Sequence, residues 1–133
     1  MTIVHAADCI IRYRGGIVLI ERQKEPFGLA LPGGKLDGNE SLEQTVVREM
    51  EEETNLTLAN VRQFRTYSAP NRDPRFRAIS TVFTADGIGE LRAKSDAKSV
   101  CVIRLEELDA LRGRFAFDHY DILSDYRQSL AEK

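Results

Sequence analysis

Cysteine is scarce in this chain, and zinc-type spacing of cysteine and histidine is missing. The two cysteines, Cys9 and Cys101, each lie in an apolar run of the 133 residues. Neither belongs to a zinc-ligand motif. Buried, reduced thiols are typical of cytoplasmic proteins, so we expect a cytoplasmic location; a disulfide between the two stays open at this point.

Long apolar runs and a large charge of one sign are missing as well. No segment approaches the roughly 18 apolar residues of a membrane span, and the first residues lack the apolar run of a signal peptide. The formal net charge is −2, from 19 basic and 21 acidic residues. This balance disfavours a protein that binds nucleic-acid polymers through bulk charge, whereas a small nucleotide carried with a metal ion remains compatible. We therefore expect neither a membrane nor a nucleic-acid polymer among its partners.

The order of apolar segments predicts an α/β fold in a single domain over residues 1–133, long enough for a substantial core. Strands or extended segments are expected over 4–12, 17–21, 29–31, 56–67, 78–84 and 99–105. Helices are expected over 41–54, 106–111 and 118–130, and a polar loop over 85–93. Strands interleaved with two main helices favour a mixed sheet with helices on both faces.

The helix expected over 41–54 carries acidic side chains where apolar ones belong. At about 100° per residue, one stripe of it is apolar: Leu42, Val46 and Met50. Glu49 and Glu53 continue this stripe, and Glu52 flanks them. Converging carboxylates repel one another, and a hard cation such as Mg²⁺ or Mn²⁺ relieves the repulsion without cysteine or histidine ligands. The alternative is a solvated acidic face, the commoner origin of a charge run.

The spacing around these glutamates resembles the Nudix box, which reads Gly, five residues, Glu, seven residues, then Arg-Glu-apolar-any-Glu-Glu-any-Gly-apolar. The chain matches this pattern at Gly34, Glu40, Arg48, Glu49, Met50, Glu52, Glu53 and Leu56. It departs at Asn55, where the family has glycine. Asparagine is the best substitute for glycine in the left-handed conformation that follows many helices.

The resemblance implies a Nudix α/β/α sandwich and a metal-dependent pyrophosphohydrolase with Mg²⁺, or Mn²⁺, as cofactor. It implies metal ligation by Glu49, Glu52 and Glu53, together with the carbonyl that precedes the box glycine, here that of Gly33. The alternative for Gly33 and Gly34 is a plain turn. Many relatives are dimers, so the resemblance also implies a homodimer.

Two charged residues of the box have supporting roles with two interpretations each. Arg48 lies one turn before Glu52 and is interpreted as a tether that orients the carboxylates, with a surface ion pair as the alternative. Glu40 binds an outer metal or supports the loop, or it is a charge favoured by the helix dipole.

The general base stays open. Many family members supply a further acid from a loop before a late strand. This chain has Asp96 there, but Ser99 stands where similar sequences often carry glutamate. Asp96, Glu90 or a box glutamate are the candidates.

Residues 68–75 resemble a segment of small ADP-ribose pyrophosphatases. Arg72 and Arg75 are the predicted phosphate ligands, because guanidinium groups bind phosphate bidentately; the alternative is a turn with both side chains solvated. Residues 117–119 resemble the same subgroup, and His119 is expected to be structural.

Three functions follow from these residues. The first is hydrolysis of a nucleoside diphosphate derivative, ADP-ribose above all, to AMP and ribose 5-phosphate. The second is MutT-like hydrolysis of a nucleoside triphosphate, and the third is a nucleotide-sensing module that has lost catalysis.

Overall fold

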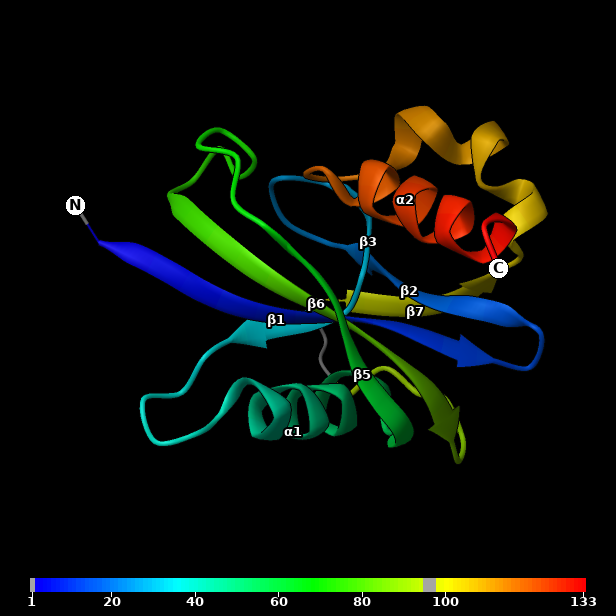
Figure 1. Cartoon of the computed structure of the whole chain (residues 1–133), viewed down its shortest axis with the longest axis horizontal. Coiled ribbons are helices and arrows are strands. Elements are labelled where there is room, and N and C mark those ends of the chain that lie inside the picture. The colour runs from blue at the N-terminus through cyan, green and yellow to red at the C-terminus, as the bar shows by residue number, and fades with distance from the viewer. Residues whose placement is uncertain (1, 95–97) are drawn as a thin grey trace.

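A mixed β-sheet lies between two helices in the computed structural model of the chain, which describes residues 2–94 and 98–133 (Figure 1). The strands are β1 Ile3–Tyr13, β2 Gly16–Arg22, β3 Gly28–Ala30, β4 Gly33–Lys35, β5 Thr57–Tyr67, β6 Arg77–Ile88 and β7 Lys98–Ile103. The α-helices are α1 Leu42–Thr54 and α2 His119–Ala131, and two 3₁₀ helices, η1 Leu105–Glu107 and η2 Asp109–Arg114, lie between β7 and α2.

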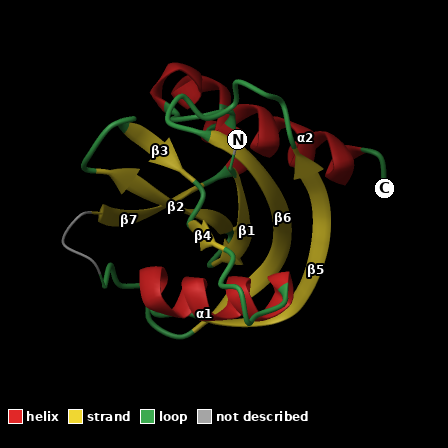
Figure 2. Ribbon diagram, turned by 90° about the vertical axis from the view of Figure 1, so that its left-hand side faces the viewer, coloured by secondary structure: helices red, strands yellow, loops and turns green. Residues whose placement is uncertain are grey.

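The sheet follows the order β3-β2-β1-β6-β5, with β4 paired to β1 and β7 paired to β2. Strands β1 and β6 run parallel over ten residue pairs from Ile3↔Arg77 to Arg12↔Asp86, and the other pairings are antiparallel. Figure 2 shows α1 below the curved sheet and α2 above it. The predicted α/β/α sandwich with a mixed sheet is confirmed.

Alternation along β1 divides the core between the two faces of the sheet. Ala7, Cys9 and Ile11 pack in the cluster that holds Val46 and Met50 of α1. Ile10 points to the other side, where the cluster includes Ile122, Leu123 and Tyr126 of α2. Each helix therefore has its own apolar surface to bury, and the apolar stripe predicted for α1 faces the sheet.

Local sequence signals set the ends of α1. The N-cap is Ser41: its hydroxyl accepts from the Gln44 N–H at 3.1 Å, and Gln44 Oε1 accepts from the Ser41 N–H at 2.8 Å. The helix ends at Asn55, whose φ of 67° lies in the left-handed region. Asparagine thus takes the conformation for which the family uses glycine.

Three element predictions need correction. Strand β6 continues to Ile88, although 85–93 was predicted as a loop, because Asp86 pairs with strand residues and binds Arg12 Nε at 2.7 Å. Gly33 and Gly34, predicted between a strand and a helix, form strand β4 by pairing with β1. The helix expected over 106–111 is two 3₁₀ helices instead.

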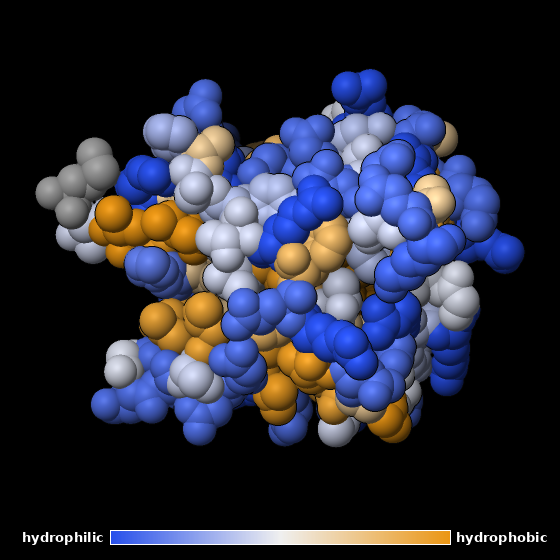
Figure 3. Space-filling model, viewed as in Figure 1, coloured by the Kyte–Doolittle hydropathy of each residue, from blue (hydrophilic) through white to orange (hydrophobic). Residues whose placement is uncertain are grey.

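Both cysteines are free thiols, so the chain contains no Cys9–Cys101 disulfide. Cys9 is buried as predicted, whereas Cys101 is only partly buried. Among the described helices, none is long and apolar enough to cross a membrane. The face drawn in Figure 3 is mostly hydrophilic, with apolar patches toward the N-terminal end and along the lower part of the view.

Candidate active site

Strands β1 and β2 separate beyond their hairpin, and the short strand β4 takes up the vacated edge of β1. Near the hairpin Arg12 pairs with Ile17, whereas farther along β1 Asp8 pairs with Gly33 and Ala6 with Lys35. A pocket of about 240 Å³ lies beside β4, lined by residues of β1, β2, β3 and β4, the 72–76 loop and residues 117 and 119.

Two glutamates of α1 face the backbone of β4. The N–H of Gly33 donates to Glu53 Oε1 at 2.9 Å, and Glu53 is only 8% exposed. A Cβ on Gly34 would lie 2.1 Å from the carboxyl carbon of Glu49, so only glycine allows this approach. Burial is the main cause that raises the pKa of Glu49; the charges of Glu53 and Glu52 add to it, and Arg48 opposes it. The predicted inward orientation of Glu49 and Glu53 is confirmed.

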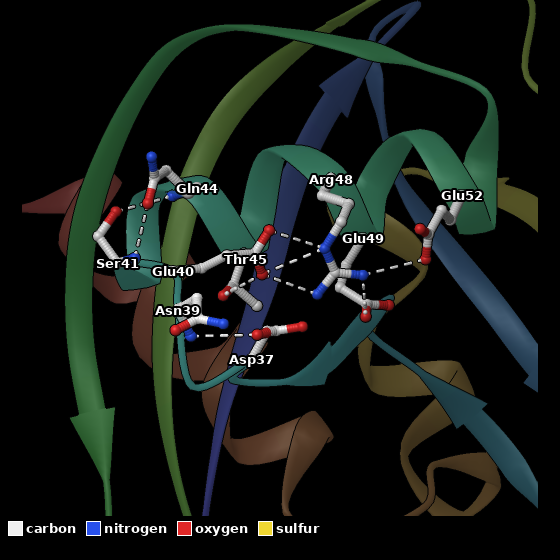
Figure 4. Close-up of polar contacts among 9 residues, drawn as sticks. All are labelled: Asp37, Asn39, Glu40, Ser41, Gln44, Thr45, Arg48, Glu49 and Glu52. Atoms are coloured by element: carbon white, nitrogen blue, oxygen red, sulfur yellow. Dashed lines mark hydrogen bonds and ion pairs between the residues drawn. The ribbon is translucent and has the colours of Figure 1, made fainter.

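Glu52 lies farther out than predicted for a converging ligand, with its side chain 58% exposed. In the described part of the chain, no three acidic, histidine or cysteine side chains already meet as a metal cluster. Arg48 instead connects the carboxylates (Figure 4). Its Nη1 donates to Glu49 at 3.0 Å and to Glu52 at 3.2 Å, and its Nε and Nη2 each bind Glu40 at 2.9 Å.

These contacts favour the tether over the surface-pair interpretation of Arg48. The guanidinium hydrogen bonds also lower the pKa of the Glu40 carboxyl. Glu40 accepts in addition from the Thr45 hydroxyl at 3.1 Å, so its contacts match the loop-supporting interpretation. The catalytic role of Arg48 and the binding of an outer metal by Glu40 stay predictions.

Asp8 is a site residue that the sequence analysis missed. It is 9% exposed, accepts from the Ser80 hydroxyl, and lies so close to Gly33 that a Cβ there would be 1.7 Å from Asp8 Oδ1. Burial raises its pKa to about 6. A lone aspartate between Ala7 and Cys9, in the middle of an apolar strand, is the signal that could have found it.

His119 is structural in its contacts, as expected. Its Nδ1 accepts from the Leu31 N–H at 2.9 Å, which places the proton of the neutral ring on Nε2, 4.0 Å from Asp8. Burial lowers its pKa to about 4.

The two arginines predicted as phosphate ligands are both near the pocket, but each already has a carboxylate partner. Arg72 binds Asp118 bidentately at 2.7 and 2.9 Å, and its side chain is 5% exposed. This buried pair fastens the loop after β5 to the N-cap of α2. Arg75 binds Asp73 at 2.9 Å and is 39% exposed. For Arg72 the contacts favour a role in the fold, and the phosphate contacts of both stay predictions.

A family model for the NUDIX domain matches residues 3–126. The chain belongs to the Nudix family. It is 44% identical over 124 residues to an ADP-ribose pyrophosphatase from Methanocaldococcus jannaschii, which covers 91% of this chain and 71% of that protein. The prediction of a Nudix hydrolase is confirmed.

Two solved structures of similar fold concern ADP-ribose. The NUDIX domain of Shewanella oneidensis NrtR, complexed with ADP ribose, has a TM-score of 0.85 and 26% identity, covering 98% of this chain and 90% of that one. A bifunctional NMN adenylyltransferase/ADP ribose pyrophosphatase from Francisella tularensis, complexed with AMP and Mn ion, has a TM-score of 0.86 and 28% identity over 96% of this chain. This chain spans 42% of that longer protein.

The α1 face of this Nudix hydrolase fits the divalent cation on which the family depends. Glu49 and Glu53 bring hard oxygen donors to the backbone of Gly33 and Gly34, and the carboxylate of Glu49 occupies the place that a Cβ on residue 34 would take. Carboxylate and carbonyl oxygens suit Mg²⁺ and Mn²⁺. The ligand set itself, with Glu52 included, stays a prediction.

The identity of the general base stays a prediction. Asp96 lies outside the described residues. Glu90 is exposed, and its carbonyl accepts from Asn55 Nδ2 at 2.8 Å, which places it beside the C-terminal end of α1. Ser99 pairs with Glu21 across β7 and β2.

Proposed function

We propose that this Nudix hydrolase cleaves the diphosphate of ADP-ribose with water, giving AMP and ribose 5-phosphate. Glu49, Glu53, Glu52 and the Gly33 carbonyl would hold Mg²⁺ or Mn²⁺. One observation carries the proposal: the pocket and the acidic face of α1 share the strand β4, with Gly33 and Gly34 lining the pocket and contacting Glu53 and Glu49. The similarity to an ADP-ribose pyrophosphatase supports the choice of substrate.

Strand β4 separates the side that would bind the nucleotide from the side that would bind the diphosphate. The pocket side is lined by cationic and aromatic side chains, which suits the nucleotide half of an anionic substrate. A substrate that crosses β4 would bring its diphosphate to the carboxylate side. A bound divalent cation would neutralise the diphosphate and polarise its P–O bonds.

Residues around the carboxylates keep their geometry fixed. Arg48 holds Glu49 and Glu52 through hydrogen bonds of 3.0 and 3.2 Å, and the Gly33 N–H holds Glu53. Carboxylates fixed in this way need little reorganisation when charge develops on the diphosphate. The base that takes the proton from water is one of the candidates already named.

A substrate screen with product identification tests the proposal. ADP-ribose and dGTP are incubated with Mg²⁺, with Mn²⁺ and with a chelator, and products are separated by chromatography. We expect AMP and ribose 5-phosphate from ADP-ribose with either metal and none with the chelator. If dGTP releases pyrophosphate while ADP-ribose stays intact, the enzyme is a MutT-like nucleoside triphosphate hydrolase and the proposal is wrong. If calorimetry detects nucleotide binding but no substrate is turned over, the protein is a nucleotide-sensing module that has lost catalysis.

A matched pair of variants on α1 tests the metal face. Glu53→Gln keeps an oxygen that can accept from Gly33 but removes the charge, so turnover should be abolished while the fold persists. Glu51→Gln, two residues earlier and exposed, is the control and should keep wild-type turnover. If Glu53→Gln keeps wild-type turnover, Glu53 is not a metal ligand.

Two further expectations remain proposals. The homodimer is tested by light scattering of the purified protein at several concentrations. The cytoplasmic location is supported by the free thiols Cys9 and Cys101, and cell fractionation tests it.

A further inference from the structure

Cations and aromatic rings alternate along the pocket. In each step the charged group lies over a ring: Arg22 at 5.0 Å from the Phe117 centroid, Arg75 at 5.2 Å from Phe117 and 4.7 Å from Phe76, and Lys35 at 5.1 Å from Phe76. All five line the pocket, although they come from β2, β4, the loop before β6 and the segment before α2. Ring faces and guanidinium planes are the surfaces on which nucleobases stack.

The guanidinium of Arg22 is held by two backbone carbonyls. Its Nε donates to the Pro26 carbonyl at 2.6 Å and its Nη2 to that of Glu25 at 3.3 Å. Among the described residues, no carboxylate forms an ion pair with Arg22, whereas Arg75 has Asp73. Burial, and then the charge of Arg75, lower the pKa of Arg22, and the charges of Asp73 and Glu53 oppose them. A phosphate bound here would add a charge-assisted contact to a guanidinium whose hydrogen bonds otherwise go to backbone carbonyls.

The backbone of Phe117 adopts an unfavourable conformation that holds its ring in place. Its φ of 55° lies in the left-handed region, which a bulky residue rarely adopts without a functional reason. Both neighbours are fixed: the Ala116 N–H donates to the Leu29 carbonyl at 2.8 Å, and Asp118 is bound by Arg72. The strained residue therefore presents its ring to the pocket in a fixed position.

We propose that Phe117 and Arg22 form the nucleoside monophosphate subsite of this enzyme: the purine stacks on the ring of Phe117, and the guanidinium of Arg22 binds the phosphate next to that nucleoside. The subsite deepens the proposed function and rests on it. The purine takes the place of Arg75 on the ring, because Arg75 is the more exposed of the two guanidiniums over Phe117. Specificity for a nucleotide half then comes from residues outside the Nudix box.

Calorimetric binding of AMP, adenosine and ribose 5-phosphate separates the two roles, because adenosine lacks the phosphate and ribose 5-phosphate lacks the base. Phe117→Leu should weaken AMP and adenosine about tenfold and leave ribose 5-phosphate unchanged. Arg22→Gln should weaken AMP about tenfold, as expected for a charge-assisted contact, and leave adenosine unchanged. Phe27→Leu and Arg62→Gln are controls, because both residues are exposed and neither lines the pocket.

The outcomes distinguish this subsite from the proposed function. Unchanged AMP affinity in folded Phe117→Leu would overturn the stacking, whatever the fate of ADP-ribose. If the wild type leaves ADP-ribose intact but the two variants bind AMP more weakly, the proposed reaction is wrong and the proposed subsite stands. Since Phe117 contacts buried His119, with ring centroids 5.2 Å apart, the variant needs a check that does not depend on its folding. Nuclear Overhauser effects from the Phe117 ring to AMP H2 or H8 in unsubstituted protein provide it, and their absence would overturn the subsite.

Discussion

Substitution of one glycine should separate the chemistry of this enzyme from its stability. Gly34 lies against the carboxylate of Glu49, so that a Cβ at this position would be 2.1 Å from Cδ, 2.3 Å from Oε2 and 2.5 Å from Oε1. All three atoms belong to the far end of a flexible side chain. Gly34→Ala therefore forces the carboxylate to move without forcing the backbone to move.

The size of the displacement follows from the contact distance. Ordinary contact begins at 3.4 Å, so the carboxyl carbon must retreat by about 1.3 Å. A misplacement of about 1 Å at a reacting centre costs about 100-fold in rate, or about 2.7 kcal/mol in the activation free energy. The 3.0 Å hydrogen bond from Arg48 to Glu49 must break or rearrange as well.

Stability should change little in the same variant. Replacing glycine by alanine at a compatible backbone position stabilises a protein by about 0.4–1 kcal/mol through the unfolded chain, which offsets part of the cost of moving one partly buried carboxylate. Gly34 has no positive φ that alanine would resist. We expect a melting temperature within a few degrees of the wild type.

Steady-state AMP release and thermal unfolding measure the two quantities, and Gly38→Ala is the matched control. A Cβ on Gly38 meets no atom within 4 Å, so this variant should keep wild-type values of both. If Gly34→Ala retains wild-type kcat/KM at limiting Mg²⁺, the position of the Glu49 carboxylate does not matter and the reasoning fails. A large fall in melting temperature would show that the new Cβ displaces the backbone rather than the carboxylate of Glu49.

Three further outcomes follow from the ion pairs and buried groups. Arg48→Ala should lower turnover by about 10–100-fold through misorientation of the carboxylates, and an unchanged rate at saturating Mg²⁺ would make Arg48 a surface residue. Burial raises the pKa of Asp8 from 3.8 to about 6, so as the pH rises from about 3 to about 7 the wild type should lose about 3 kcal/mol of stability relative to Asp8→Asn, as measured by urea unfolding. A flat difference would show that the carboxyl is solvated. Arg72→Ala should cost about 3–5 kcal/mol in unfolding free energy, because it leaves Asp118 without its partner; a higher KM at unchanged stability would contradict this structural role and support the phosphate-binding prediction.

The helix α1 could be predicted closely because its signals are local. Its capping box, its apolar stripe and the left-handed residue at its end all lie within residues 41–55, and the structure confirms them. Strand β4 could not be predicted in this way. Gly33 and Gly34 have low strand propensity, and they form a strand only because Asp8 and Ala7 of β1 offer paired positions more than 20 residues earlier in the chain.

The same distinction between local and distant contacts explains the site. The glutamates of α1 follow from one helical period, whereas Arg72 and Asp118 are 46 residues apart in sequence. A sequence shows that Arg72 can bind an anion; it does not show that a carboxylate of its own chain is already there. Arg22 and Phe117 were missed for the converse reason. Arg22 carries no motif, and the resemblance at residues 117–119 did not single out the ring of Phe117; only the separation of β1 from β2 brings the two to one pocket.

Strand β4 has only three residues, yet it stands between the surface that would recognise a nucleotide and the surface that would hydrolyse it. Substitutions at residues 75–76 or 117 can reshape the first without reaching Glu49 or Glu53, which contact the strand from its other side. Grafting these two segments from a relative with another preference should therefore transfer substrate choice while retaining the host's hydrolytic helix. Such a partition gives evolution and engineering a small, separable unit with which to diversify one reaction over many diphosphates.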